Sequence, residues 1–264
     1  MSWLNSIRRK ADAGAVSRAS RPPMTGPPAR DKARAGGEVR MDGTERHLRE
    51  RIVALCREMN RNGLNQGTAG NISARHGARM LLTPSATPYD LMTPEMIAAM
   101  PLDGDGSVWE GPLKPSTEWR FHRDILRSRP DAGAVVHAHP TFATAIAITR
   151  RSIPACHYMV AAFGGHDVRC AGYALYGTEA LSREALAALR DRTACLLANH
   201  GIIAIGESLE KAMWRAVELE TLAKQYHHSL QLEGGPVILS RAEIDAVLER
   251  FADYGLRGAA AGTP

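Results

Sequence analysis

Two histidines that close a short apolar run constrain the fold of this chain more than any other feature. Residues 134–139 read Ala-Val-Val-His-Ala-His, after a Pro-Asp breaker and before Pro140. The β-branched residues predict a strand that ends at the proline. Because residues two apart in a strand point to the same face, His137 and His139 should present their imidazole rings side by side. A divalent cation fits between such rings, although for this pair alone two packed or surface histidines are an equal alternative.

A third histidine, His200, lies between two further apolar runs. Residues 195–198 and 202–205 each predict a short strand, and Asn-His-Gly separates them. An imidazole within a buried run needs hydrogen bonds or a metal ion, so a hydrogen-bonded core histidine and a metal ligand both remain open for His200. Three histidines with one open coordination position are typical of catalytic zinc, whereas structural zinc is usually enclosed by cysteines.

A carboxylate and two hydroxyl groups are predicted at the start of a helix that precedes the histidine pair. Residues 114–122 read Lys-Pro-Ser-Thr-Glu-Trp-Arg-Phe-His, in which Ser116 is a suitable cap and Glu118 lies in the first turn. A helix N-terminus favours a charged carboxylate, so Glu118 is either a metal ligand and base or an ordinary first-turn acid. The N–H groups of this turn, with the loops 65–71 and 83–86, can bind a phosphate, although each loop alone has a structural explanation.

The remaining periodicity predicts a single α/β domain of the α+β kind, in which helices cover a central, mostly antiparallel sheet. Tyrosine- and glycine-rich residues 172–177 are expected to form a loop. The expected helices span residues 44–62, a short turn from Thr93, and residues 141–149, 178–190, 208–230 and a segment after Ser240. The further expected strands are a hairpin of residues 71–74 and 80–83, a pair around the turn 103–106, and residues 152–158.

The net positive charge of the chain belongs to its N-terminal end. Residues 1–40 hold nine lysines and arginines against three acids, a balance of +6, which leaves −1 for the rest of the net +5. Residues 1–43, rich in Arg, Ala, Gly and Pro, are predicted to be a disordered extension, with a transit peptide as the alternative. The nearly neutral body argues against a nucleic-acid partner.

Cysteine usage and hydropathy indicate where the chain resides. Its four cysteines show neither Cys-x-x-Cys spacing nor a disulfide-dense pattern, which favours a reducing compartment. No apolar run approaches the ~20 residues of a membrane helix. We therefore expect a cytoplasmic protein without a membrane partner.

Five motifs in order resemble the class II aldolase/adducin family, and most closely its L-fuculose-1-phosphate aldolases. The motifs are Leu-Asn-Gln-Gly-Thr-Ala-Gly-Asn at 64–71, Ser-Thr-Glu-Trp-Arg-Phe-His at 116–122, Val-Val-His-Ala-His at 135–139, Ile-Pro-Ala-Cys-His-Tyr-Met at 153–159 and Asn-His-Gly at 199–201. The resemblance implies a class II aldolase-like catalytic domain at 44–257, followed by a short tail at 258–264.

The resemblance implies a lyase with one zinc ion per chain, which cleaves a ketose 1-phosphate similar to L-fuculose 1-phosphate. The products would be dihydroxyacetone phosphate and an aldehyde, and the enzyme would be a homotetramer with its sites at subunit interfaces. Carried over residue by residue, it assigns zinc to His137, His139 and His200, with Glu118 as a displaceable fourth ligand and acid/base; phosphate to Gly70, Asn71, Ser85, Ala86, Ser116 and Thr117; and the aldehyde end to Tyr158 of a neighbouring subunit and to Tyr254.

Two departures and two alternatives accompany this resemblance. Ala86 stands where the aldolases commonly have glycine, and Thr117 where they have serine; each keeps a backbone N–H or a hydroxyl for phosphate. A sugar-phosphate 4-epimerase or a decarboxylase of a keto-acid phosphate would use the same metal and phosphate groups, but such epimerases usually have aspartate in place of Glu118. A non-catalytic, adducin-like binding module is the alternative from a different class, and retention of the three histidines, Glu118 and Tyr158 argues against it.

Overall fold

The computed structural model describes residues 41–253. Residues 1–40 and 254–264 lie outside that part, and with them most of the predicted N-terminal extension, the predicted tail and Tyr254. The boundaries predicted for the extension and the tail therefore remain expectations.

A seven-stranded sheet in the order β3-β2-β1-β4-β7-β6-β5 forms the centre of the described domain. All neighbouring strands are antiparallel except β5 and β6, which agrees with the predicted α/β domain and its mostly antiparallel sheet. The strands are β1 Asn71–His76, β2 Arg79–Leu82, β3 Ala98–Pro101, β4 Ala134–Ala138, β5 Cys170–Ala171, β6 Ala194–Leu197 and β7 Gly201–Gly206.

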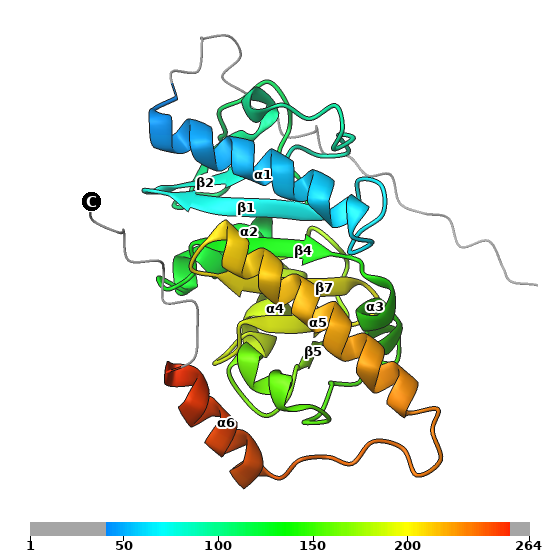
Figure 1. Cartoon of the computed structure of the whole chain (residues 1–264). Coiled ribbons are helices and arrows are strands. Elements are labelled where there is room, and N and C mark those ends of the chain that lie inside the picture. The colour runs from blue at the N-terminus through cyan, green and yellow to red at the C-terminus, as the bar shows by residue number, and fades with distance from the viewer. Residues whose placement is uncertain (1–40, 254–264) are drawn as a thin grey trace, which may run out of the picture. The chain divides into compact units, whose positions relative to one another are not determined.

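Helices cover both faces of this sheet (Figure 1). Side chains alternate between the faces, so Val136 packs into the cluster beneath α1, α3 and α5, whereas its neighbour Val135 packs into the cluster beneath α2 and α4. None of the described helices is long and apolar enough to cross a membrane. The helices are α1 Gly43–Arg61, α2 Trp119–Ser128, α3 Thr141–Ile148, α4 Glu179–Ala188, α5 Leu209–Ser229 and α6 Arg241–Asp253, with two short 3-10 turns, η1 Pro94–Met96 and η2 Tyr158–Phe163.

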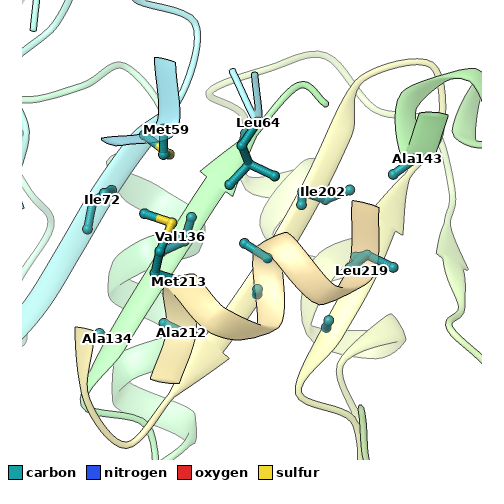
Figure 2. Packing of buried hydrophobic residues seen from close by; sticks show 14 of the residues in the cluster. Met59, Leu64, Ile72, Ala134, Val136, Ala143, Ile202, Ala212, Met213 and Leu219 are labelled. Atoms are coloured by element: carbon teal, nitrogen blue, oxygen red, sulfur yellow. The ribbon is translucent and has the colours of Figure 1, made fainter. Parts of the chain in front are cut away.

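The longest helix, α5, lies across β4 and β7 and holds the central strands from one side (Figure 2). Met213 and Leu219 of this helix face the sheet, where they meet Val136 and Ile202 in the same apolar cluster. All four side chains are buried, Met213 with 4% exposure and the others with none. Burial of this stripe is the main stabilisation of α5, because helix propensity alone is weak.

Side-chain caps begin the later helices where the sequence predicted. Ser208 accepts a hydrogen bond from the N–H of Lys211 at the start of α5. Ser240 and Glu243 form a reciprocal capping box before α6, in which each side chain accepts from the other residue's N–H, at 3.3 and 2.7 Å. These caps fix the helix starts independently of the core.

Two strand predictions are wrong. Residues 152–158 contribute only one isolated bridge, between Ile153 and Val168, because Pro154 lacks an N–H and the chain then turns into η2 at Tyr158. The turn 103–106 does not join two strands: β3 precedes it, and the return segment pairs only through a bridge of Ala99 with Glu110. The two-residue strand β5 was not predicted, since two residues show no periodicity.

We expect Leu219→Ala to lower the free energy of unfolding by about 2–5 kcal/mol, because it leaves a cavity between α5 and the sheet. Val217→Ala on the same helix is the matched control. Val217 is 38% exposed, so its truncation should cost less than about 1 kcal/mol. Chemical denaturation of both variants measures the difference; equal losses would show that α5 is not held by its inner face.

Candidate metal centre

Strand order brings the candidate ligands together at one end of the sheet. The central strand β4 pairs antiparallel with β1 on one side and β7 on the other, with His137 opposite both Asn71 and Ile203. The end of β4 therefore lies beside the beginnings of β1 and β7. His139 follows β4 by one residue, and His200 immediately precedes β7.

The three histidines form a compact cluster. Their ring centroids are 4.8 to 4.9 Å apart, and one nitrogen from each lies within 4.8 Å of the others. His137 Nδ1 lies 2.8 Å from the carbonyl oxygen of Ile202, which can only accept, so Nδ1 carries a proton, and in its neutral form the ring presents a lone pair on Nε2. Such a backbone hydrogen bond is how metal-binding imidazoles are usually oriented.

Glu118 closes the fourth side of this cluster. It is the N-cap of α2 and only 6% exposed. Its Oε2 lies 3.2 Å from His137 Nε2, and its Oε1 lies 3.3 Å from His200 Nε2. Among the described residues Oε1 accepts no well-aligned hydrogen bond, and its polar neighbour is the imidazole of His200.

The electrostatics of the cluster favour a cation at its centre. Burial raises the pKa of Glu118, but the nearby His137 and then His200 outweigh burial and hold that pKa below its ordinary value. Burial lowers the pKa of His139 to about 3, and His137 and His200 lower it further, so His139 is a neutral donor at pH 7. Burial also lowers the pKa of His137, but Glu118 reverses that shift and raises it.

Neutral imidazole nitrogens and a buried carboxylate are the donor set that divalent transition metals prefer. His137 Nε2 and His139 Nε2 are 2.9 Å apart, a spacing that needs a proton or a cation between the two lone pairs. The residues present thus fit the divalent metal ion predicted from sequence.

Two glycines allow the neighbouring loops to approach β4. A Cβ at Gly70 would meet the carbonyl oxygen of His137 at 2.7 Å, and a Cβ at Gly201 would meet Ala138 O at 2.4 Å and His139 Cδ2 at 2.6 Å. Neither position needs a positive φ, so both glycines are required by close approach.

The loops predicted to hold phosphate lie next to one another, beside Glu118. An antiparallel bridge between Pro84 and Pro115 joins two of these loops, in which the Ser85 N–H donates to Lys114 O at 2.9 Å and the Ser116 N–H donates to Thr83 O at 3.0 Å. The prediction that Ser116 caps α2 is wrong. Glu118 occupies the N-cap position, and the Ser116 hydroxyl accepts a hydrogen bond from the Glu118 N–H at 3.3 Å. Ala86 adopts a φ of 52°, a left-handed conformation that glycine would adopt without strain.

Three polar residues support the cluster from behind, and two of them, His122 and Asn65, had no predicted role. Asn71, predicted to bind phosphate, donates from Nδ2 to Glu118 Oε2 at 2.9 Å, and its Oδ1 meets His122. Burial lowers the pKa of His122 to about 3, so this ring is neutral. Asn65 Oδ1 accepts from the N–H of His139 at 3.3 Å. In the sequence, His122 was marked by its place at the end of the motif 116–122 and by its spacing of four residues from Glu118.

A cavity of about 340 Å³ opens onto the cluster. His139, His200 and Glu118 line its floor, and Thr117 lies beside them. The loop 172–177 supplies the rim through Tyr173 and Tyr176, which are 57% and 63% exposed. The aromatic side chains of that loop, which the sequence placed but did not explain, are therefore part of the site.

Tyr158 lies outside this cavity. It begins η2, is 50% exposed, and is not among the residues that line the cavity of its own chain. Tyr254 lies beyond the described residues.

Comparison with known proteins defines the family. The profile of the Class II Aldolase and Adducin N-terminal domain matches residues 50–227. The 5-methylthioribulose-1-phosphate/5-deoxyribulose-1-phosphate aldolase of Rhodospirillum rubrum is 49% identical over 215 residues, covering 81% of this chain and 96% of that protein. The L-fuculose phosphate aldolase of Escherichia coli is 50% identical over 210 residues, covering 80% and 96%.

A solved structure agrees with these relatives. An L-fuculose 1-phosphate aldolase superposes with a TM-score of 0.74 at 36% identity, covering 78% of this chain and 96% of that one. The chain therefore belongs to the class II aldolase and adducin family, and with its histidine cluster it is a metal-dependent class II aldolase, a lyase.

We expect Gly201→Ala to weaken metal binding by about 10–100-fold, because the added methyl group must displace His139 or the end of β4. Metal titration followed by elemental analysis measures the loss. Gly43→Ala is the control, since a Cβ there has no neighbour within 4 Å. Undiminished metal affinity in Gly201→Ala would show that the close approach of Gly201 does not hold the ligands in place.

Proposed function

We propose that the chain is a zinc-dependent aldolase that cleaves a ketose 1-phosphate to dihydroxyacetone phosphate and an aldehyde. The observation that carries the proposal is the cluster of three imidazoles from His137, His139 and His200 beside the buried carboxylate of Glu118, which lies within 3.3 Å of two of them. Zinc suits three nitrogen donors with an open position. We propose these histidines as its ligands, with Glu118 as a displaceable fourth.

The chemistry requires one proton to leave the C4 hydroxyl and one to reach C3 as the C3–C4 bond breaks. Bound zinc would supply a Lewis acid that withdraws electrons from the ketone at C2. Glu118 is the group we assign to C3: as a carboxylate it removes the C3 proton of dihydroxyacetone phosphate in synthesis, and as the carboxylic acid so formed it returns that proton in cleavage. Its burial at the cavity floor shields this proton from water.

The phosphate would bind at the three adjacent loops. Thr117 lines the cavity, and we assign Ser85, Ala86 and Ser116 to the same phosphate because the Pro84–Pro115 bridge joins their loops. Asn71 has both ends of its amide engaged by Glu118 and His122, so we assign the phosphate contact there to the backbone with Gly70.

The aldehyde end would lie toward the tyrosine rim. The relatives' names include L-fuculose phosphate, 5-methylthioribulose 1-phosphate and 5-deoxyribulose 1-phosphate. Each of these sugars ends in a methyl or methylthio group at the carbon farthest from its phosphate. The exposed rings of Tyr173 and Tyr176 offer that group an apolar surface. We therefore propose a substrate with a deoxygenated terminal carbon.

Substrate cleavage tests this function directly. Release of dihydroxyacetone phosphate, followed with a coupled reductase, should be seen with 5-deoxyribulose 1-phosphate, its methylthio analogue or L-fuculose 1-phosphate. Ribulose 1-phosphate, which adds only a terminal hydroxyl, should have a kcat/KM about 10–100-fold lower than its deoxy counterpart.

Glu118→Gln is the control for this assay, since it should keep bound zinc and lose turnover by about 10²–10⁴-fold. Absence of dihydroxyacetone phosphate from every substrate would exclude the aldolase and favour an epimerase or a decarboxylase. Equal rates on the ribulose pair would contradict the apolar rim.

Tyr158 fits the proposal only from another subunit. Its exposed position outside the cavity of its own chain is consistent with a ring of four chains, in which each interface joins one cavity to a neighbour's tyrosine. We propose that its hydroxyl exchanges the proton of the C4 oxygen.

Mixed assemblies test this arrangement. Tyr158→Phe and His139→Ala chains should each be poorly active alone, but co-expressed they should form rings in which some interfaces pair an intact metal site with an intact tyrosine. We expect recovery of activity in mixed tetramers verified by native mass spectrometry. Mixed tetramers no more active than the single variants would show that Tyr158 does not act across the interface.

A further inference from the structure

A buried hydrogen-bonded chain lies directly behind Glu118. Asn71 and Ser73 are two residues apart in β1, so they point to the same face of the sheet. Glu118 and His122 are four residues apart at the start of α2, so they lie on the same face of that helix. The strand pair and the helix pair meet, and all four side chains are at most 6% exposed.

The order of donors along this chain is determined by its ends. The Glu118 carboxylate can only accept, so the Asn71 amide must present Nδ2 to it and Oδ1 to His122. Oδ1 can only accept as well, so His122 carries its proton on Nε2. His122 Nδ1 then accepts from the Ser73 hydroxyl at 2.7 Å. At each contact one group can only donate and the other only accept, so the hydrogen bonds all run in one direction, from Ser73 to Glu118.

The consequence for Glu118 is that its two oxygens are not equivalent. Oε2 receives the Asn71 amide at 2.9 Å and lies 3.2 Å from His137 Nε2. Oε1 lies 3.3 Å from His200 Nε2 and accepts no well-aligned hydrogen bond among the described residues. Without the amide, the carboxylate could rotate and exchange the two oxygens. A carboxylate oxygen that is not tied to an amide is also the better proton acceptor.

We propose that His122 and Ser73 are positioning residues, which through Asn71 fix the carboxylate of Glu118 so that Oε1 is the oxygen that exchanges a proton with substrate. This inference rests on the proposed aldolase function for its kinetic consequence, but the orientation of Asn71 and Glu118 is a property of the protein alone. His122 touches neither the cavity nor the three clustered histidines through a hydrogen bond, so it acts through Asn71.

Two substitutions of His122 separate orientation from packing. His122→Leu keeps an apolar volume but removes the donor to Asn71, and should lower kcat by about 10–100-fold with KM within about two-fold. His122→Gln can place an amide N–H where Nε2 was, and should recover kcat to within about five-fold of the parent. Ser73→Ala, a smaller change that should fold even where His122→Leu does not, should reduce kcat by a smaller factor.

Ile125→Ala is the matched control. Ile125 is fully buried on the same helix and belongs to the cluster beneath it, so its loss should lower stability without changing kcat. Bound zinc should stay near one per chain in every variant. Crystal structures should show the Asn71–Glu118 contact retained in His122→Gln and lost in His122→Leu.

The results separate this inference from the proposed function. Parental kcat in His122→Leu and Ser73→Ala, or no recovery in His122→Gln relative to His122→Leu, would overturn the positioning role. If the parent cleaves none of the ketose 1-phosphates, the proposed function fails. The crystal structures then decide the orientation alone, and an unmoved Glu118 in His122→Leu would overturn it.

Discussion

The antiparallel pairing of β4 with both of its neighbours is the interaction on which the site depends. Because β1 and β7 run opposite to β4, both begin where β4 ends, and the ladder places His137 level with Asn71 and Ile203. A parallel neighbour would begin at the other end of the sheet. A shift of one residue in register would turn His137 to the face beneath α5. The apolar residues that hold the register on both faces therefore also hold the metal ligands.

Burial sets the protonation of the clustered side chains, and it also costs folding free energy. A carboxylate with 6% exposure is unfavourable unless opposite charge or donors compensate it, and here the imidazoles and one amide do so. A divalent cation would complete that compensation, so metal binding and the stability of this end of the sheet are coupled. The two glycines of the flanking loops also keep this end of the sheet compact, since a side chain at Gly70 or Gly201 would force the loops apart.

Much of this arrangement could be predicted because it is local. Periodicity identified β4, the hairpin of β1 and β2, and α5, and two-residue spacing placed His137 and His139 on one face. Relations between distant segments could not be obtained that way. The hydrogen bonds that join Asn71 to His122 depend on how α2 lies against β1, and no local pattern reports a helix orientation. The two wrong strand predictions failed because those segments have no neighbouring strand to pair with, which a strand needs as much as it needs propensity.

The loop 172–177 forms part of the cavity but not of the histidine cluster. It connects β5 to α4, supplies both tyrosines of the cavity rim, and contributes no side chain to the histidine cluster. Its two exposed tyrosines can therefore be replaced without removing a ligand. One reaction centre can in this way accept different sugar phosphates when a six-residue surface segment changes. The same segment is the natural place to redirect the enzyme toward aldehydes that it does not use in the cell.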